Sequence, residues 1–139
     1  MSRSALAAAA LIVSSCATQP KPVIHSVCVE IKEMPEHETA FMLKRTAKYL
    51  GEYHMSQATT GCDVVAKFQP FGKFQAEIVG LVKSGYWSQE GNVTVTHNGV
   101  VFLEDEQISV RGQDSRQDAL DATAWQIVKP VVKSFRPTQ

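Results

Sequence analysis

The chain has 139 residues, with 14 Lys and Arg against 14 Asp and Glu, so its formal net charge is zero. A balanced charge without a long basic block excludes a protein that attracts nucleic acid through its overall field. The length is enough for one domain with a substantial hydrophobic core, but not for two.

The amino-terminal segment is the most informative part of the sequence. Residues 5–13 are an uninterrupted apolar run. A helix of that length rises about 13 Å, which is too short for the roughly 30 Å hydrocarbon core of a bilayer. Arg3 precedes the run and small residues follow it, as in a secretory signal peptide. Residues 13–16, Val-Ser-Ser-Cys, resemble the lipobox of bacterial lipoproteins.

This resemblance implies that Cys16 carries a membrane anchor. In bacterial lipoproteins the cysteine thiol is coupled to diacylglycerol, a signal peptidase cuts before it, and its new amino group is acylated. The predicted organisation is a signal peptide at residues 1–15, a lipidated tether at 16–22 and one periplasmic domain at 23–136, with no cofactor besides this lipid. By the sorting rule of enterobacterial lipoproteins, Ala17 in place of Asp favours the periplasmic face of the outer membrane.

Two alternatives remain open for this segment. Ser15 and Ala17 suit an ordinary signal peptidase site, and cleavage there would remove Cys16 and release a soluble periplasmic protein. The segment could instead be an uncleaved tail of a cytosolic protein. The position, the flanking residues and the cysteine together favour the lipoprotein, and several acyl chains would make its anchor practically permanent.

The other two cysteines, Cys28 and Cys62, form an even pair, which favours a disulfide in an oxidising compartment. The bond would close a loop of roughly 35 residues and add about 3 to 4 kcal/mol by loop-closure entropy. Two buried free thiols are the alternative. Because Cys28 alternates with Val27 and Val29 along a predicted strand, its side chain is expected on the opposite face of the sheet.

The first predicted elements of the domain are a strand at residues 23–32 and a helix. Pro35 suits the first turn of that helix, and Gly51 suits the left-handed residue that ends it. The apolar residues recur at helical spacing, at Ala40, Leu43, Ala47 and Leu50.

Three segments after this helix are predicted from alternating apolar and polar residues and from turn residues. They are a strand at 62–68, a turn at 69–72, and a strand at 73–83 that stops at residues 84–85. Phe71 is then expected at the tip of a Pro-Gly hairpin.

The clearest turn signal in the sequence is Asn98-Gly99. It predicts a β-hairpin, because these two residues readily adopt the positive φ angles of a type I′ turn. Its strands are expected at 93–96 and 100–103, and residues 108–111 continue the second strand or add another.

A capping box at residues 115–118, Ser-Arg-Gln-Asp, opens the last predicted helix. Pro130 has no N–H to donate, so it is expected to kink or restart this helix. The apolar stripe consists of Leu120, Ala124, Ile127 and Val131, with Trp125, Val128 and Phe135 beside it.

The element order β-α-β-β-β-(β)-α predicts an α+β fold, a two-layer sandwich with two helices on one face of a mostly antiparallel sheet. Residues 49–55 and 61–68, the hairpin and the helix start at 114–122 resemble small periplasmic lipoprotein domains. These are the penicillin-binding-protein activators and relatives of the TolB amino-terminal domain, and the resemblance implies fold more than function. The activators carry a long linker, whereas residues 17–22 reach at most about 20 Å, which favours a partner near the membrane.

Signatures of catalysis and metal binding are absent from the sequence, including G-x-S-x-G, phosphate-binding loops, H-E-x-x-H and C-x-x-C. His37 lies between two glutamates and could bind a metal, but a solvated residue of the first helical turn is favoured. We therefore expect neither an enzyme nor a metal site.

Partner binding is expected at two groups of residues. Aromatic side chains near predicted loops can anchor an interface, although one of two adjacent aromatics could pack in the core instead. A basic stripe on the last helix suits anionic lipid or an acidic partner, with the helix dipole and solubility as the favoured explanation. The candidates are Phe71, Tyr86, Trp87, Lys129, Lys133 and Arg136.

The favoured function is a non-enzymatic adaptor or assembly factor of an envelope machine, such as a secretion, pilus or conjugation apparatus. Its expected partners are the bilayer, through Cys16, and an envelope protein, but no nucleic acid. The alternative is a periplasmic inhibitor or immunity protein that blocks a toxin or hydrolase, and an enzyme comes third.

Overall fold

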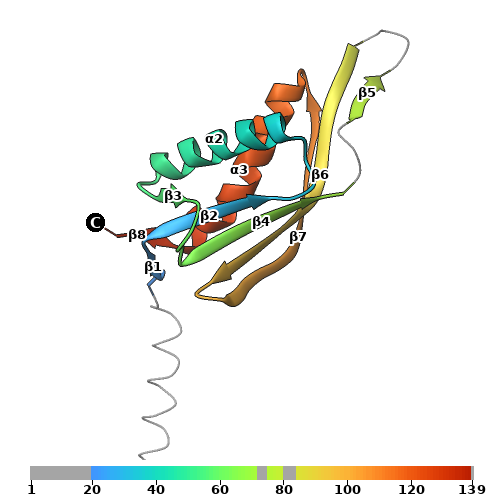
Figure 1. Ribbon diagram of the computed structural model, residues 1–139. Coiled ribbons are helices and arrows are strands. Elements are labelled where there is room, and N and C mark those ends of the chain that lie inside the picture. Colours follow the sequence, from blue (N-terminus) through green and yellow to red (C-terminus); the bar gives the residue numbers. More distant parts are fainter. Residues whose placement is uncertain (1–19, 72–74, 80–83, 139) are drawn as a thin grey trace, which may run out of the picture.

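A computed structural model describes residues 20–71, 75–79 and 84–138, without the side chains of 75–79 and 84–86 (Figure 1). The described residues form two longer helices and a set of strands. In chain order these are β1 (Val23–Ile24), β2 (Ser26–Ile31), α2 (Glu36–Glu52), β3 (Ser56–Ala58), β4 (Val64–Pro70), β5 (Gln75–Val79), β6 (Ser84–His97), β7 (Val100–Gln113), α3 (Arg116–Ser134) and β8 (Arg136–Pro137).

The main sheet of the described chain has six strands in the order β3-β2-β4-β6-β5, with β7 paired to β6. Strands β3, β2 and β4 run parallel, whereas β4, β5 and β7 each pair antiparallel with β6. A small second sheet joins β1 to β8 in parallel. Both helices cover one face of the main sheet (Figure 1). The predicted α+β two-layer fold is confirmed, while β3 and β8 were not foreseen.

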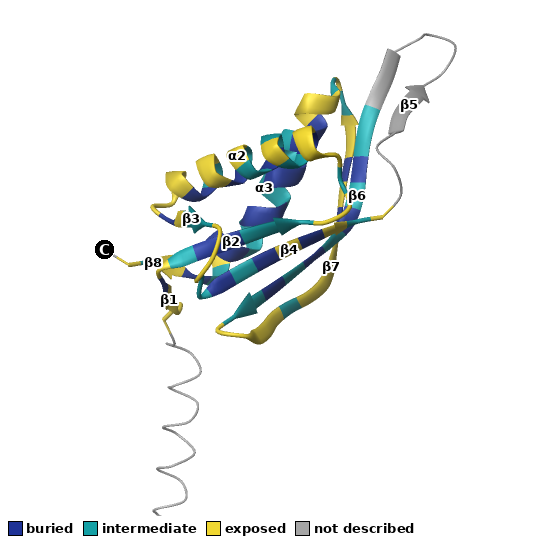
Figure 2. Cartoon of the chain, viewed as in Figure 1, coloured by how far each residue is buried: buried dark blue, intermediate teal, exposed yellow. Residues whose placement is uncertain are grey.

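The core lies between this face and the helices, and the strand register explains which residues enter it. Val27 pairs with Val64, and Ala66 pairs with Val95, so all four side chains point toward the helices and are buried. Figure 2 shows the same buried positions along the strands and the inner side of α3. At Gly91 a Cβ atom would lie 2.7 Å from the backbone oxygen of Gln69, so only glycine fits there.

The predicted hairpin at Phe71 is wrong. Strands β4 and β5 pair with successive parts of β6, β4 with residues 91–97 and β5 with residues 84–88, so the chain continues along one edge of β6. The predicted stop at residues 84–85 is also wrong, because β6 begins there and pairs with β5. Part of the predicted strand 73–83 lies outside the described residues.

The hairpin at Asn98-Gly99 is confirmed. Asn98 has φ 51° and Gly99 has φ 80°, as a type I′ turn requires. The flanking strands are 14 residues each, longer than predicted, and residues 108–111 continue β7 rather than add a strand. A bulge in β7 places Phe102 between the pairs of residues 101 and 103 with β6.

The buried stripe of α2 differs from the predicted one. Ala40 and Ala47 are exposed and Leu43 is half-buried, so only Leu50 of the four predicted residues is buried. Two polar side chains take the inner positions instead, because each has a partner there. The stripe that is buried consists of Glu38, Met42, Thr46 and Leu50.

The ends of α2 also differ from the prediction. Pro35 is the N-cap residue, and Gly51 lies inside the last turn. The chain leaves the helix at His54, which has φ 62°. The His54 N–H donates to the Gly51 carbonyl and the Met55 N–H to the Leu50 carbonyl, as in a Schellman motif, so His54 holds the left-handed position expected for glycine.

Helix α3 follows the sequence pattern closely. The Ser115 hydroxyl accepts a hydrogen bond from the Asp118 N–H at 3.0 Å, which confirms the N-cap. The predicted stripe is buried throughout. The helix continues through Pro130 without a restart, since Ile127 and Val131 hold the turns on both sides against the core. Arg136 lies beyond the helix, in β8.

Candidate functional site

Within residues 20–71, 75–79 and 84–138, no group of three His, Cys, Asp or Glu side chains is placed to hold a metal ion. The His37 side chain is 80% exposed and lies 3.8 Å from the Glu38 carboxylate. In the same described part of the chain, no helix is long and apolar enough to cross a membrane.

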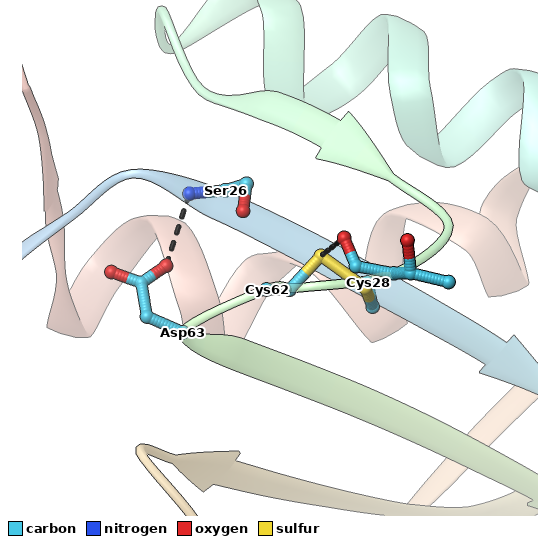
Figure 3. The surroundings of a disulfide bond; sticks show 5 residues. Ser26, Cys28, Cys62 and Asp63 are labelled. Atoms are coloured by element: carbon cyan, nitrogen blue, oxygen red, sulfur yellow. Dashed lines mark hydrogen bonds between the residues drawn. A yellow bond between two sulfur atoms is a disulfide. The ribbon is translucent and has the colours of Figure 1, made fainter.

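The predicted disulfide joins Cys28 on β2 to Cys62, two residues before β4 (Figure 3). The two Cα atoms lie 5.6 Å apart, within the range that a disulfide spans. Cys28 and Ala58 are paired residues of β2 and β3, so the loop from β3 returns directly to β2 at the bond. The bond therefore fixes the start of β4 beside β2, close to where the described chain begins.

Asp63, the next residue, ties three segments together at this end (Figure 3). Its carboxylate accepts hydrogen bonds from the backbone N–H groups of His25 at 2.9 Å and Ser26 at 3.0 Å. Its backbone carbonyl accepts from the Asn98 N–H at 2.8 Å. Burial raises the pKa of Asp63, but these backbone hydrogen bonds outweigh burial and hold the pKa below its ordinary value. The first strands and the β6–β7 turn thus meet at one residue, through its carboxylate and its backbone carbonyl.

Strand β7 begins, directly after the β6–β7 turn, with three consecutive exposed apolar residues, which we call the hairpin tip. Val100 is 70% exposed, Val101 is 52% exposed and Phe102 is 49% exposed. The Phe102 and His97 rings both contact the buried Phe135 ring, each with centroids 5.0 Å apart. Phe135 thus packs against one side of the hairpin tip, and the other side is exposed to solvent.

A groove runs between β7 and the second half of α3. Its volume is about 410 Å³, and its lining includes the predicted partner-binding residues Lys129 and Lys133 together with Glu106. Among the described strands β7 pairs with β6 alone, so its other edge borders this groove without a neighbouring strand. Arg136, predicted on the same stripe, instead lines a separate hollow beside Val23.

The predicted aromatic anchors lie toward the opposite end, near β5 and the start of β6. Phe71 is 40% exposed, and its N–H donates to the Glu90 carbonyl at 3.2 Å. Trp87 is half-buried, with the Arg116 guanidinium 5.6 Å from its ring centroid. The Tyr86 side chain lies outside the described side chains. The structure therefore separates these aromatics from the basic residues.

An ion pair that was not predicted from the sequence lies beside Trp87. The Glu38 side chain is 2% exposed, and its carboxylate pairs with the Arg116 guanidinium. Both residues open a helix, Glu38 in the first turn of α2 and Arg116 at the start of α3. The pair fastens the two helix starts, because a buried carboxylate needs a cation beside it.

A second unforeseen cluster fastens the middle of the two helices. The Arg45 guanidinium and the Tyr49 hydroxyl both donate to the Asp121 carboxylate, at 2.6 and 2.7 Å. Burial raises the pKa of Asp121, but these two hydrogen bonds outweigh it, so the pKa lies below its ordinary value. Trp125 completes the cluster, edge-on to Tyr49 at 5.6 Å and stacked on Tyr53 at 6.1 Å. The cluster therefore joins α2 to α3 through hydrogen bonds and ring contacts.

Comparison with known proteins supplies the fold but no family. The sequence matches no known protein family, and no curated protein matches it in sequence. The fold is similar to that of a minor lipoprotein from Acinetobacter baumannii, with a TM-score of 0.58 and 11% identity over 78% of this chain and 92% of that one. It is also similar to PelC from Paraburkholderia phytofirmans, a dodecamer, with a TM-score of 0.50 and 10% identity over 81% of this chain and 92% of that one.

Proposed function

We propose that this chain is a lipid-anchored lipoprotein of the bacterial envelope, and that its domain acts as a non-enzymatic adaptor at the periplasmic face of the outer membrane. The lipid anchor is supported by the short spacing between Cys16 and the first strand of the domain. Strand β1 begins at Val23, so six residues separate the proposed lipid from the domain. Similarity of fold to a lipoprotein of another bacterium supports the same assignment.

The adaptor role rests on the groove and on the free edge of β7 beside it. An exposed strand edge presents backbone N–H and C=O groups to which an extended segment of another protein can add as a further strand. In the lining of the groove, Lys129 and Lys133 outnumber the one acidic residue, Glu106. This favours a segment with acidic side chains, because opposite charges steer such a segment and set its register. We assign this surface to an envelope protein partner.

The anchor is tested by replacing the cysteine. The variant C16S should remain an unprocessed precursor without lipid, and its mature form should disappear from the outer-membrane fraction. The matched control is S15A, which keeps a small residue before the cysteine and should fractionate as the parent protein does. Unchanged processing and fractionation of C16S would exclude the anchor.

The adaptor role is tested by cross-linking in intact cells. A photo-crosslinking amino acid at Gln107, which is exposed and lines the groove, should give a discrete adduct with one envelope protein. The same amino acid at Lys44, exposed on α2, is the control and should give none. Adducts of equal yield at both positions, or none at either, would contradict the role. An adduct of twice the chain's own mass would mean that the groove binds a second copy of this chain instead of an envelope partner. The dodecameric state of PelC is the reason to consider this outcome.

A further inference from the structure

We propose that the hairpin tip, Val100, Val101 and Phe102, docks into the lipid–water interface of the bilayer that holds the anchor. The proposal rests on the proposed lipid anchor and adds a second, non-covalent contact that fixes how the domain stands on the membrane. The hairpin tip would contact the headgroup and upper acyl region of a phospholipid leaflet.

The composition of the tip is the first argument. The type I′ turn needs only Asn98 and Gly99, so the turn itself does not explain the three apolar residues that follow it. Edge strands of soluble proteins are usually protected by charged residues, whereas here the outermost part of β7 is apolar and about half exposed or more. Contiguous exposed apolar side chains mark a surface that meets a protein or a membrane.

The position of the tip is the second argument, because it lies where the tether enters the fold. Asp63 binds the backbone of His25 and Ser26 through its carboxylate and that of Asn98 through its carbonyl. Phe135, which supports Phe102, directly precedes the strand that pairs with Val23. Figure 1 shows β1 and the β6–β7 turn at the lower end of the molecule, and β5 at the upper right.

The length of the tether is the third argument. Residues 17–22 span at most about 20 Å when fully extended, so a lipid on Cys16 keeps this end of the domain within that distance of the bilayer. The far end, with β5, has no comparable constraint. Of the exposed apolar residues, those at the tip are therefore held near lipid, together with Val23, which is 42% exposed.

The charges around the tip indicate the depth of docking. Exposed Lys21 and Arg136 lie at the same end and suit lipid phosphates. The acidic residues 104–106 follow the tip along β7 and are exposed, so they resist entry beyond Phe102. Apolar faces that lie in the interface enter by about 5 to 10 Å, which three residues of a strand can span.

The test uses the mature lipidated protein reconstituted into phospholipid vesicles. A tryptophan is placed at the tip as V100W, and the control F71W places one at the other end, where Phe71 is also exposed. Both variants keep Cys16 and the two native tryptophans, so each adds one tryptophan to the same background. Vesicles carry lipids with bromine or nitroxide quenchers on the upper acyl chain.

The added fluorescence of V100W should be blue-shifted and quenched severalfold more than that of F71W. Flotation of the vesicles reports the anchor separately, because an anchored protein rises with the lipid whether or not the tip docks. Protein that floats with an unquenched tip would overturn this inference and leave the anchor intact. Protein that does not float with the vesicles would show that the proposed lipid anchor is wrong. A blue shift without quenching would mean that the tip contacts protein, which also overturns the inference.

Discussion

The two ends of the domain are held in different ways. At the tether end, a disulfide and the Asp63 carboxylate fix backbone segments, while apolar side chains of the hairpin tip stay exposed. At the far end, the buried Glu38 pairs with Arg116, which lies over the Trp87 ring. The tether end thus combines a cross-linked backbone with exposed apolar side chains, a combination that the proposed docking requires. At the far end, the ion pair between Glu38 and Arg116 joins the starts of the two helices.

The largest effect is expected from removing the disulfide at the tether end. The double variant C28S/C62S should lose about 3 to 4 kcal/mol of unfolding free energy, because the unfolded chain regains the entropy that the closed loop denies it. Chemical denaturation measured with and without reductant checks this. Reductant should bring the parent protein down to the variant and leave the variant unchanged; a loss that persists equally in reductant would mean that the cysteines act by packing.

The next effect is expected at the far end. The variant R116M leaves the buried Glu38 carboxylate without Arg116. Because the Arg116 side chain is 47% exposed, water screens part of the pair, and the unfolding free energy should fall by about 2 kcal/mol. The control is R111M, since Arg111 pairs with Glu90 at 2.6 Å with 69% of its side chain exposed. That loss should be much smaller and weaker in high salt. Equal losses would show that the burial of the Glu38 carboxylate adds nothing to the cost of losing its cation.

The smallest effect is expected from the Asp63 carboxylate. Its pKa is lower folded than unfolded, so its contribution is complete above the unfolded pKa, near 3.8, and is lost as the pH falls through the folded value. The variant D63N should lose about 1 kcal/mol at neutral pH. The difference from the parent should shrink below pH 4. A difference that stays constant down to pH 2 would assign the effect to geometry rather than charge.

The sequence predicted those parts of the fold whose inner residues are apolar. The stripe of α3 and the alternation along β4 are buried as expected, because hydrophobic periodicity is direct evidence there. In α2 the pattern failed, since Thr46 and Glu38 are buried through partners on other elements. The Thr46 hydroxyl bonds to Gln57, and Glu38 pairs with Arg116. Such partners depend on the folded arrangement.

Local turn chemistry was predictable at one place and not at another. Asn98-Gly99 adopts the expected type I′ turn, whereas α2 ends at His54 rather than at Gly51. Met55 directly follows His54, and its side chain is buried. Because of this burial, the left-handed residue that ends the helix is His54, three residues after Gly51. Of the candidate site, the disulfide was predicted, but the hairpin tip was not, because exposure of its residues follows from the edge position of β7.

The most direct test of the account is the intact mass of the mature protein extracted from membranes. The proposed lipid anchor and the disulfide predict a chain that begins at Cys16, carries a diacylglycerol and an amide-linked acyl chain, and is two hydrogens lighter than its reduced form. A chain that begins at Thr18 without lipid, or one that begins at Met1, would contradict the lipid anchor and with it the assignment of the hairpin tip to the bilayer.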